Sequence, residues 1–181
     1  MPLIVDGDIT DWIPLAFLIA VLLIAVVTDL RAQRIPNLLT LPAAVLAVIY
    51  FTVRHGTDGL WSSLAGLGLG YAIWLILYAI GKMGAGDVKL VGAVGALIGP
   101  REVAIASLFI AIVGGLYAIA LLAWSGALGK TIRRYGSMAH ALLRTGRVMY
   151  LPPVEQAHAP ELCYGVAIAL GTLLALGRHF V

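Results

Sequence analysis

The sequence predicts an all-α, polytopic membrane protein with about six transmembrane helices. Of its 181 residues, 61% are hydrophobic and 12% are charged, and the mean hydropathy is +1.00. A water-soluble domain of this length could not bury so much apolar surface. Long uncharged runs recur along the chain, and about 20 apolar residues suffice to cross the ~30 Å hydrocarbon core of a bilayer. We therefore expect one integral-membrane domain over residues 1–181.

The expected spans, in chain order, are 12–28, 38–53, 60–80, 88–99, 103–124 and 162–177. The first should remain in the mature protein, because Asp6, Asp8 and Asp11 precede it where a secretory signal peptide would be basic. The fourth has only about 12 residues, so it needs help from Val88 and Pro100 at its ends or shielding by neighbouring helices.

Glycines are concentrated inside two of these spans, at 66–70 and 92–95. Small residues let helices approach closely in lipid, so we expect helix contacts at both places. The single cysteine, Cys163, excludes an intrachain disulfide and is expected to be a buried packing residue.

The distribution of basic residues predicts the orientation in the membrane. Nine of the twelve Lys and Arg residues fall in loops on one side of the six-span arrangement, and the positive-inside rule assigns that side to the cytoplasm. Both termini then lie outside. The nine residues are Arg31, Arg34, Lys82, Lys89, Lys130, Arg133, Arg134, Arg144 and Arg147, and the other three are Arg54, Arg101 and Arg178. The net charge of +3 therefore reflects loops that face anionic lipid, and it gives no indication of nucleic-acid binding.

One long polar stretch, residues 125–160, separates the fifth and sixth spans. It contains an apolar stripe at helical spacing, and its basic residues lie mostly off that stripe. The stripe is formed by Leu128, Ile132, Tyr135, Ala139 and Leu142. The pattern predicts an amphipathic helix at the cytoplasmic membrane surface, in contact with lipid.

Two acidic residues at the ends of apolar spans are the strongest functional signal. Asp29 ends the first span and Asp87 begins the fourth, so the predicted topology places both at the cytoplasmic face. Acids near lipid are costly and usually functional. Two neighbouring carboxyl groups share a proton, so one can activate a water while the other polarises a peptide carbonyl. The pair therefore predicts aspartic-protease chemistry with neither metal nor cofactor.

Each acid also has a purely structural interpretation. Asp29 could pair with Arg31 or Arg34 at the membrane interface, and Asp87 could cap its helix. The four histidines lack metal-ligand spacing, so no metal site is expected.

The residues around the acids suggest how a substrate could be held. Four basic residues could bind an acidic residue of a substrate, lower the pKa of an Asp, or simply anchor the loops on the cytoplasmic side. They are Arg31, Arg34, Lys82 and Lys89. Gly84 and Gly86 would let the backbone approach an extended substrate.

The pair Pro36-Asn37 is expected to break the chain between the first two spans. Asn37 is expected to cap the second span.

Three segments resemble the prepilin peptidase family, the type IV leader peptidases. Gly84–Leu90 resembles the family's Gly-x-Gly-Asp motif, and Asp29–Asn37 is similar to its first catalytic segment, an Asp followed by basic residues and Ile-Pro-Asn. Pro160–Ala169, which includes Tyr164 and Gly165, resembles its Pro-x-x-Tyr/Phe-Gly-x-Ala-x-Ala segment. The order of the three segments is that of the family.

The resemblance implies a membrane aspartic endopeptidase with Asp29 and Asp87 as its catalytic pair. Its substrates would be prepilin-like proteins of pilus or secretion systems, which have a basic leader followed by a hydrophobic helix. Cleavage would take place at the cytoplasmic face of the cell membrane. The short chain resembles the peptidases of tight-adherence (Flp) pilus systems.

The chain departs from the family in one respect. Full-length members carry a cytoplasmic region with paired cysteines that hold zinc, and they also N-methylate the trimmed pilin. Here the first expected span begins at residue 12 and the chain has one cysteine. On this comparison, methyltransferase activity is not expected.

Two other classes of protein fit some of the same observations. In an ion- or proton-coupled carrier the two acids would bind a cation or relay protons. Such folds often show repeats and interrupted helices at the midplane. This sequence shows no convincing repeat, and its two acids lie at the ends of spans. A structural subunit of a pilus or secretion complex would tolerate replacement of either Asp by Asn.

Overall fold

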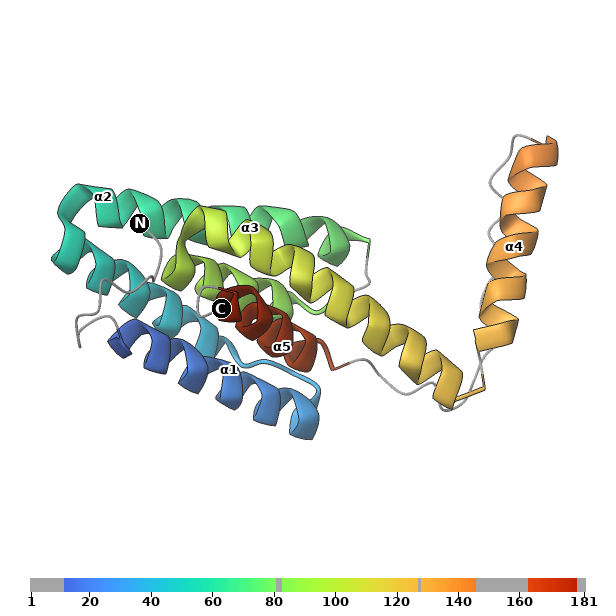
Figure 1. Ribbon diagram of the computed structural model, residues 1–181, viewed down its shortest axis with the longest axis horizontal. Helices are drawn as coiled ribbons and strands as arrows, with labels where there is room; N and C mark the ends of the chain where they lie inside the picture. The colour runs from blue at the N-terminus through green and yellow to red at the C-terminus, as the bar shows by residue number, and fades with distance from the viewer. Residues whose placement is uncertain (1–11, 81–82, 127, 146–162, 179–181) are drawn as a thin grey trace. The chain divides into compact units, whose positions relative to one another are not determined.

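The computed structural model describes residues 12–80, 83–126, 128–145 and 163–178, and every regular element in these ranges is a helix. This confirms the all-α fold class. The helices are α1 (Trp12–Ala32), α2 (Asn37–Ala79), α3 (Ala85–Trp124), α4 (Leu128–Thr145) and α5 (Tyr164–Gly177) (Figure 1). The expectations for Asp6, Asp8, Asp11, Lys82 and residues 146–162, which include Arg147 and the end of the expected amphipathic segment, lie outside the described residues.

Three of these helices, α1, α2 and α3, are long and apolar enough to cross a membrane, and α5 is a shorter apolar helix of 14 residues. Six spans remains a prediction. Both α2 and α3 contain one non-helical glycine, Gly56 with φ 62° and Gly99 with φ 81°. Both breaks lie close to the expected boundaries between spans. Each falls at a glycine because positive φ values are easily adopted only without a Cβ. Figure 1 shows each of the two helices turning back on itself.

The stretch of α3 before Gly99 forms the centre of the core. From Asp87 to Gly99 every residue except Lys89 is buried. The stretch where the short fourth span was expected is therefore shielded by its neighbours, while its role as a span stays a prediction.

Close helix contacts occur at the glycine clusters, as expected. Gly66 and Gly95 face each other so closely that a Cβ on either would meet the backbone of the other. A Cβ on Gly70 would lie 2.7 Å from the carbonyl oxygen of Val91. The missing side chains thus let α2 and α3 pack backbone to backbone.

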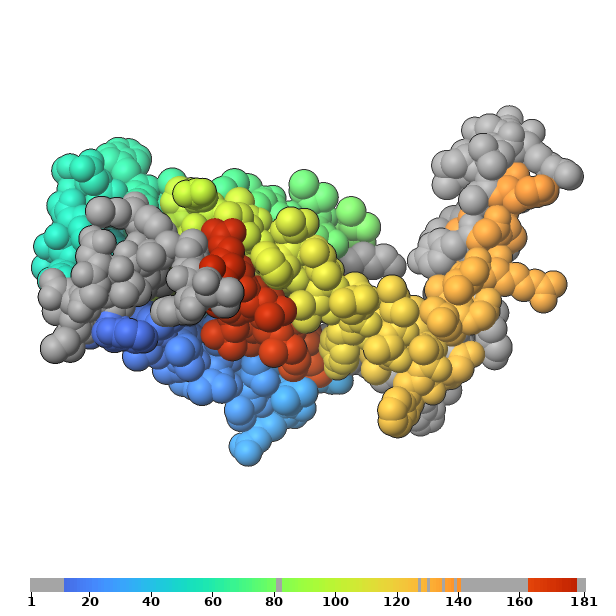
Figure 2. All heavy atoms as spheres, in the orientation of Figure 1, coloured from blue at the N-terminus to red at the C-terminus, as the bar shows by residue number. Residues whose placement is uncertain are grey.

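Helix α5 packs against α1, and Figure 2 shows it lying between α1 and α3. A Cβ on Gly171, at the middle of α5, would lie 2.5 Å from the Cα of Ile110 in α3. Cys163, which precedes α5, was expected to be buried and is instead partly exposed. The expectation was wrong because Cys163 lies just outside the packed part of the helix.

The chain divides into two compact units, residues 1–114 with 163–181 and residues 115–162. The first unit contains both acids of interest. The second contains α4, which is strongly amphipathic and lies within the stretch where an amphipathic segment was expected. The single-domain organisation stays a prediction.

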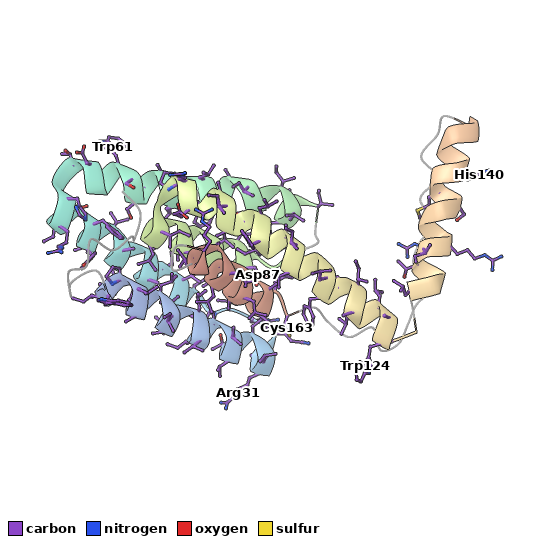
Figure 3. The ribbon with its side chains drawn as sticks, viewed as in Figure 1. Arg31, Trp61, Asp87, Trp124, His140 and Cys163 are labelled. Carbon is purple, nitrogen blue, oxygen red and sulfur yellow. The ribbon has the colours of Figure 1, made fainter. Side chains whose placement is uncertain are left out.

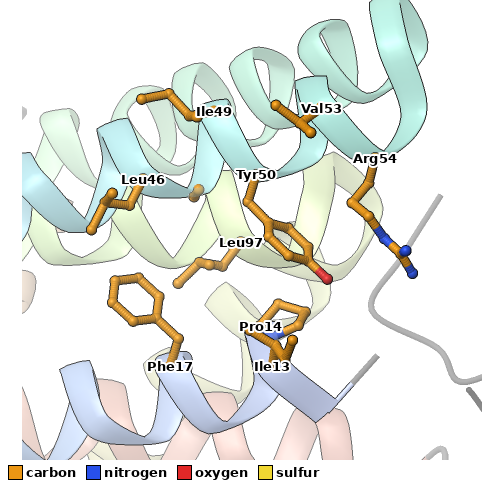
Figure 4. Close-up of a pocket in the computed structure, with 10 residues that line it drawn as sticks. Ile13, Pro14, Phe17, Leu46, Ile49, Tyr50, Val53, Arg54 and Leu97 are labelled. Carbon is orange, nitrogen blue, oxygen red and sulfur yellow. The ribbon is translucent and has the colours of Figure 1, made fainter. Parts of the chain in front are cut away.

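An apolar cavity of about 440 Å³ lies between the first turns of α1 and the stretch of α2 before Gly56 (Figure 4). It is lined by Ile13, Pro14, Phe17, Leu46, Ala47, Ile49, Tyr50, Val53, Arg54 and Leu97. Ile13 and Asp29 are sixteen residues apart on one helix, or roughly 24 Å at 1.5 Å per residue. This cavity is therefore separate from the acids.

Candidate active site

Asp29 lies in the last turn of α1 and is 5% exposed. Its Oδ2 accepts a hydrogen bond of 2.8 Å from the backbone N–H of Gly165, the second residue of α5. A buried carboxylate needs such a donor, because desolvation without one is costly. The bond joins two segments of the chain that are 136 residues apart.

Gly165 leaves no room for a side chain at this place. A Cβ built there would lie 2.9 Å from Oδ2 of Asp29 and 3.0 Å from its Cβ. Glycine is therefore required here by the close approach of α5 to Asp29, not by backbone dihedral angles.

Asp87 is the third residue of α3 and is 8% exposed. Its Oδ2 accepts a hydrogen bond of 3.1 Å from the N–H of Gly84, which immediately precedes the helix. The carboxylate thus reaches back over the positive end of its own helix. The capping interpretation is correct in part, since Asp87 caps the helix from within the first turn.

The carboxylates of Asp29 and Asp87 interact electrostatically with each other, and Asp87 also interacts with Tyr164, the first residue of α5. Asp87 is buried, and Figure 3 shows its place among the helices of the bundle. The end of α1 and the starts of α3 and α5 therefore meet at one place.

The connection between α1 and α2 packs against the start of α3. Gln33 ends α1 in the left-handed region, with φ 50°, and its N–H donates to the carbonyl oxygen of Asp29 over 2.8 Å. Ile35 is buried, and a Cβ on Gly86 would lie 2.7 Å from the carbonyl oxygen of Ile35. The missing side chain of Gly86 thus lets the connection pack closely against the start of α3. The role toward the substrate that was expected from the sequence stays a prediction.

Lys89 contacts the start of α2. Its Nζ donates to Oδ1 of Asn37 over 2.8 Å. Asn37 was expected to cap α2, and this is wrong: the capping position is Pro36, and no side-chain cap bond is present. The amide of Asn37 is instead directed across to α3.

Arg31 and Arg34 are exposed, and Figure 3 shows Arg31 pointing away from the bundle. Within the described residues, the one ion pair joins Arg178 to Glu102, with 2.6 Å between Nη2 and Oε2. Asp29 is therefore held by a backbone amide, and its structural interpretation as an ion-pair partner of Arg31 or Arg34 does not hold.

Two features of this unit were not predicted from the sequence. They are the contact of Ile35 with Gly86 and the ion pair of Glu102 with Arg178. The sequence did contain a signal for the ion pair, because the predicted topology places the loops of Glu102 and Arg178 on the same side of the membrane.

Each of the two buried carboxyl groups accepts a hydrogen bond from a backbone N–H, and the charge of Asp29 acts on Asp87. In the part of the chain that the structure describes, no group of three or more His, Cys, Asp or Glu side chains is placed so that it could hold a metal ion. Two carboxyl groups in one low-dielectric site can share a proton, which suits them to acid and base roles in a single reaction.

The chain is similar to known proteins over the region that contains Asp29 and Asp87. The model of the type IV leader peptidase family matches residues 16–119, a range that includes both Asp29 and Asp87. None of the solved structures matches significantly.

Three curated relatives carry the name prepilin leader peptidase/N-methyltransferase. The protein of Bacillus subtilis is 30% identical over 119 residues, which cover 63% of this chain and 46% of the relative. That of Vibrio cholerae is 35% identical over 50% of this chain and 39% of the relative. That of Escherichia coli is 35% identical over 51% of this chain and 44% of the relative. The chain thus matches less than half the length of each relative.

Proposed function

The chain belongs to the type IV leader peptidase family, and we propose that it is a membrane aspartic endopeptidase that removes the leader of prepilin-like proteins. One observation carries the proposal. Asp29 and Asp87 come from different helices, are both buried, and interact with each other within the region that matches the family.

The proposed reaction needs only these two carboxyl groups and water. The pair begins with one shared proton. The ionised carboxylate removes a proton from a water molecule, whose oxygen attacks the peptide carbonyl, while the protonated carboxyl donates a hydrogen bond to the carbonyl oxygen. Collapse of the tetrahedral intermediate breaks the C–N bond, and a carboxyl proton passes to the leaving amine. The proton belongs to the pair, because coupled groups titrate together.

The neighbouring residues would position this pair. The N–H groups of Gly165 and Gly84 each hold one carboxylate oxygen. Rigid placement of reacting groups can be worth large factors in rate. Tyr164 interacts with Asp87 and would shape the site on the side of α5. The bond from Lys89 to Asn37 would fix the start of α3 against α2.

The substrate class follows from the family and from where the acids lie on their helices. Asp29 lies near the end of α1 and Asp87 near the start of α3, a position suited to a peptide bond at the membrane surface. A prepilin-like substrate has a hydrophobic helix of about 20 residues, enough to cross the bilayer beside the enzyme. Its junction with the basic leader must be extended, because a helix engages the scissile peptide in its own hydrogen bonds.

The positive-inside rule supports a cytoplasmic site. Arg31 and Arg34 flank Asp29 in sequence and are exposed, so they are suited to contact lipid phosphates or an acidic residue of the substrate.

Co-expression with a prepilin-like protein from the same genome tests the proposal. The N-terminus of the pilin is determined by mass spectrometry with the wild-type chain, with Asp87→Asn, and with Asp58→Asn as a control at an exposed acid in α2. We expect the leader to be lost with the wild type and with Asp58→Asn, and retained with Asp87→Asn. Cleavage by Asp87→Asn would refute the proposal. The same mass reports whether the new N-terminus is methylated.

A further inference from the structure

Helix α4 differs in kind from the other helices. It has 18 residues, or about 27 Å of helix, but it is too polar to be among the helices that could cross a membrane. Its sequence contains four basic residues and no acidic residue. An amphipathic helix of this composition is stabilised when its apolar face is buried against a partner.

The two faces of α4 are distinct. Ile132 is apolar and 62% exposed, and Leu128 lies one turn before it on the same side. Arg133, Ser137 and His140 recur at intervals of four and three residues, and all three are exposed. Ser137 is nine residues from Leu128, or two and a half turns, which places it on the opposite side of the helix.

The residues just before α4 indicate where it begins. Trp124 is the last residue of the apolar helix α3 and is 94% exposed. Tryptophan at the end of a membrane helix is typical of the interface between hydrocarbon and water. The chain then turns at Gly126, with φ 66°, and α4 starts at Leu128. Only three residues separate Trp124 from Leu128, so α4 must begin close to the interface.

We propose that α4 binds an anionic lipid surface, with Leu128 and Ile132 toward the acyl chains and Arg133 toward the headgroups and water. The basic residues are complementary to the phosphates of anionic lipids, and the absence of acidic residues within the helix removes any repulsion from that surface. The inference does not depend on peptidase activity, so either can fail without the other.

The test uses the full chain in lipid nanodiscs. Cys163, the only cysteine, is replaced by Ser, and single cysteines are introduced as Ile132→Cys on the apolar face and Ser137→Cys on the opposite face. Each variant is labelled with an environment-sensitive dye. The discs contain phosphatidylcholine alone or with phosphatidylglycerol, and a quencher is attached to the lipid chains. Leu128→Cys provides a second apolar-face position if Ile132→Cys does not fold.

In discs with phosphatidylglycerol, we expect the emission at position 132 to shift to shorter wavelength and to be quenched from the lipid chains. The emission of the label at position 137 should be that of a dye in water, without quenching from the lipid chains. The shift at 132 should be smaller in phosphatidylcholine alone. The double variant Arg133→Glu/Arg134→Glu, which leaves two basic and two acidic residues in the helix, should abolish the difference between the two lipids.

Three results would overturn the proposal. Equal environments at 132 and 137 would mean that no face is buried in lipid. A shift at 132 without quenching from the lipid chains would mean that the apolar face packs on protein. A shift that is independent of lipid charge and of the charge reversal would exclude recognition of anionic headgroups.

Discussion

At the scale of single residues, Gly165 is the position where a single methyl group would disturb the surroundings of Asp29. Its missing side chain lets α5 approach Asp29 closely enough for the 2.8 Å hydrogen bond. In Gly165→Ala, a Cβ within 3.0 Å of Asp29 would force the carboxylate or α5 to move. We expect the variant to fold and cleavage to fall by roughly 10- to 100-fold, since displacements of ångström size in an active site have effects of this order.

The matched control is Gly177→Ala at the other end of the same helix, where a Cβ meets nothing within 4 Å. Initial rates on a prepilin-like substrate, together with thermal unfolding in detergent, separate a change in catalysis from a change in stability. Wild-type cleavage by Gly165→Ala would show that the close contact with Asp29 does not matter for the reaction.

The contact between Lys89 and Asn37 makes a second prediction at this scale. If Lys89 acts by holding Asn37, then Lys89→Met and Asn37→Ala should each weaken kcat/KM, and the double variant should be no worse than the worse single variant. The coupling free energy in this double-mutant cycle should be about 0.5–1.5 kcal/mol, the net contribution of one hydrogen bond. Strictly additive effects would instead assign Lys89 a role toward the substrate that is independent of Asn37.

How far the site could be predicted from the sequence also depends on individual residues. Asp29 and Asp87 were identifiable because an acid at the end of an apolar run is rare, a property that is local in sequence. The partner of Asp29 was not identifiable, since Gly165 is 136 residues away. Asn37 was expected to cap its helix because its residue type favours that role, but tertiary contact with Lys89 determines where its side chain lies.

At the scale of helices, Arg178 and Glu102 hold the end of α5 against α3. Glu102 is 1% exposed, and its Oε2 lies 2.6 Å from Nη2 of Arg178. Removing one partner of a buried ion pair costs ~3–5 kcal/mol, and less is expected here because the Arg178 side chain is 32% exposed. Arg178→Ala should therefore lower the midpoint temperature of thermal unfolding.

The control for this prediction is Arg101→Ala, which removes an exposed charge next to Glu102 in sequence. The double variant Arg178→Ala/Glu102→Gln should recover part of the lost stability, because a neutral amide is less costly to bury than a carboxylate. If Arg178→Ala and Arg101→Ala have equal effects, the ion pair does not stabilise the helix contact.

Helix breaks were predictable to within a few residues, and for a physical reason. Gly56 and Gly99 fall at or beside the short polar intervals that separated apolar runs in the sequence. What the sequence could not supply is the mutual packing of the helices, which depends on contacts such as Gly66 with Gly95 that join distant segments. Fold class therefore followed from composition, while the geometry of the site did not.

For the whole molecule, the positive-inside rule predicts that the acids face the cytoplasm. In a Cys163→Ser background, a cysteine introduced at Arg34 should react with a membrane-impermeant thiol reagent only from the cytoplasmic side. A cysteine introduced at Arg101 should react only from the outside. Both positions are exposed, so reactivity reports sidedness and not burial. The reverse pattern would place the acids on the outer face and contradict the proposed site of cleavage.

Asp29 and Asp87 are proposed to act as one catalytic pair. The most direct test of this pairing is the cleavage rate of a prepilin-like substrate by purified Asp29→Asn, Asp87→Asn and the double variant in lipid vesicles, with folding checked by thermal unfolding. We predict that each single variant loses roughly 10³-fold or more in rate, and that the double variant loses no more than either, because groups that act as a unit are strongly non-additive. Substantial cleavage by either folded single variant would contradict the account.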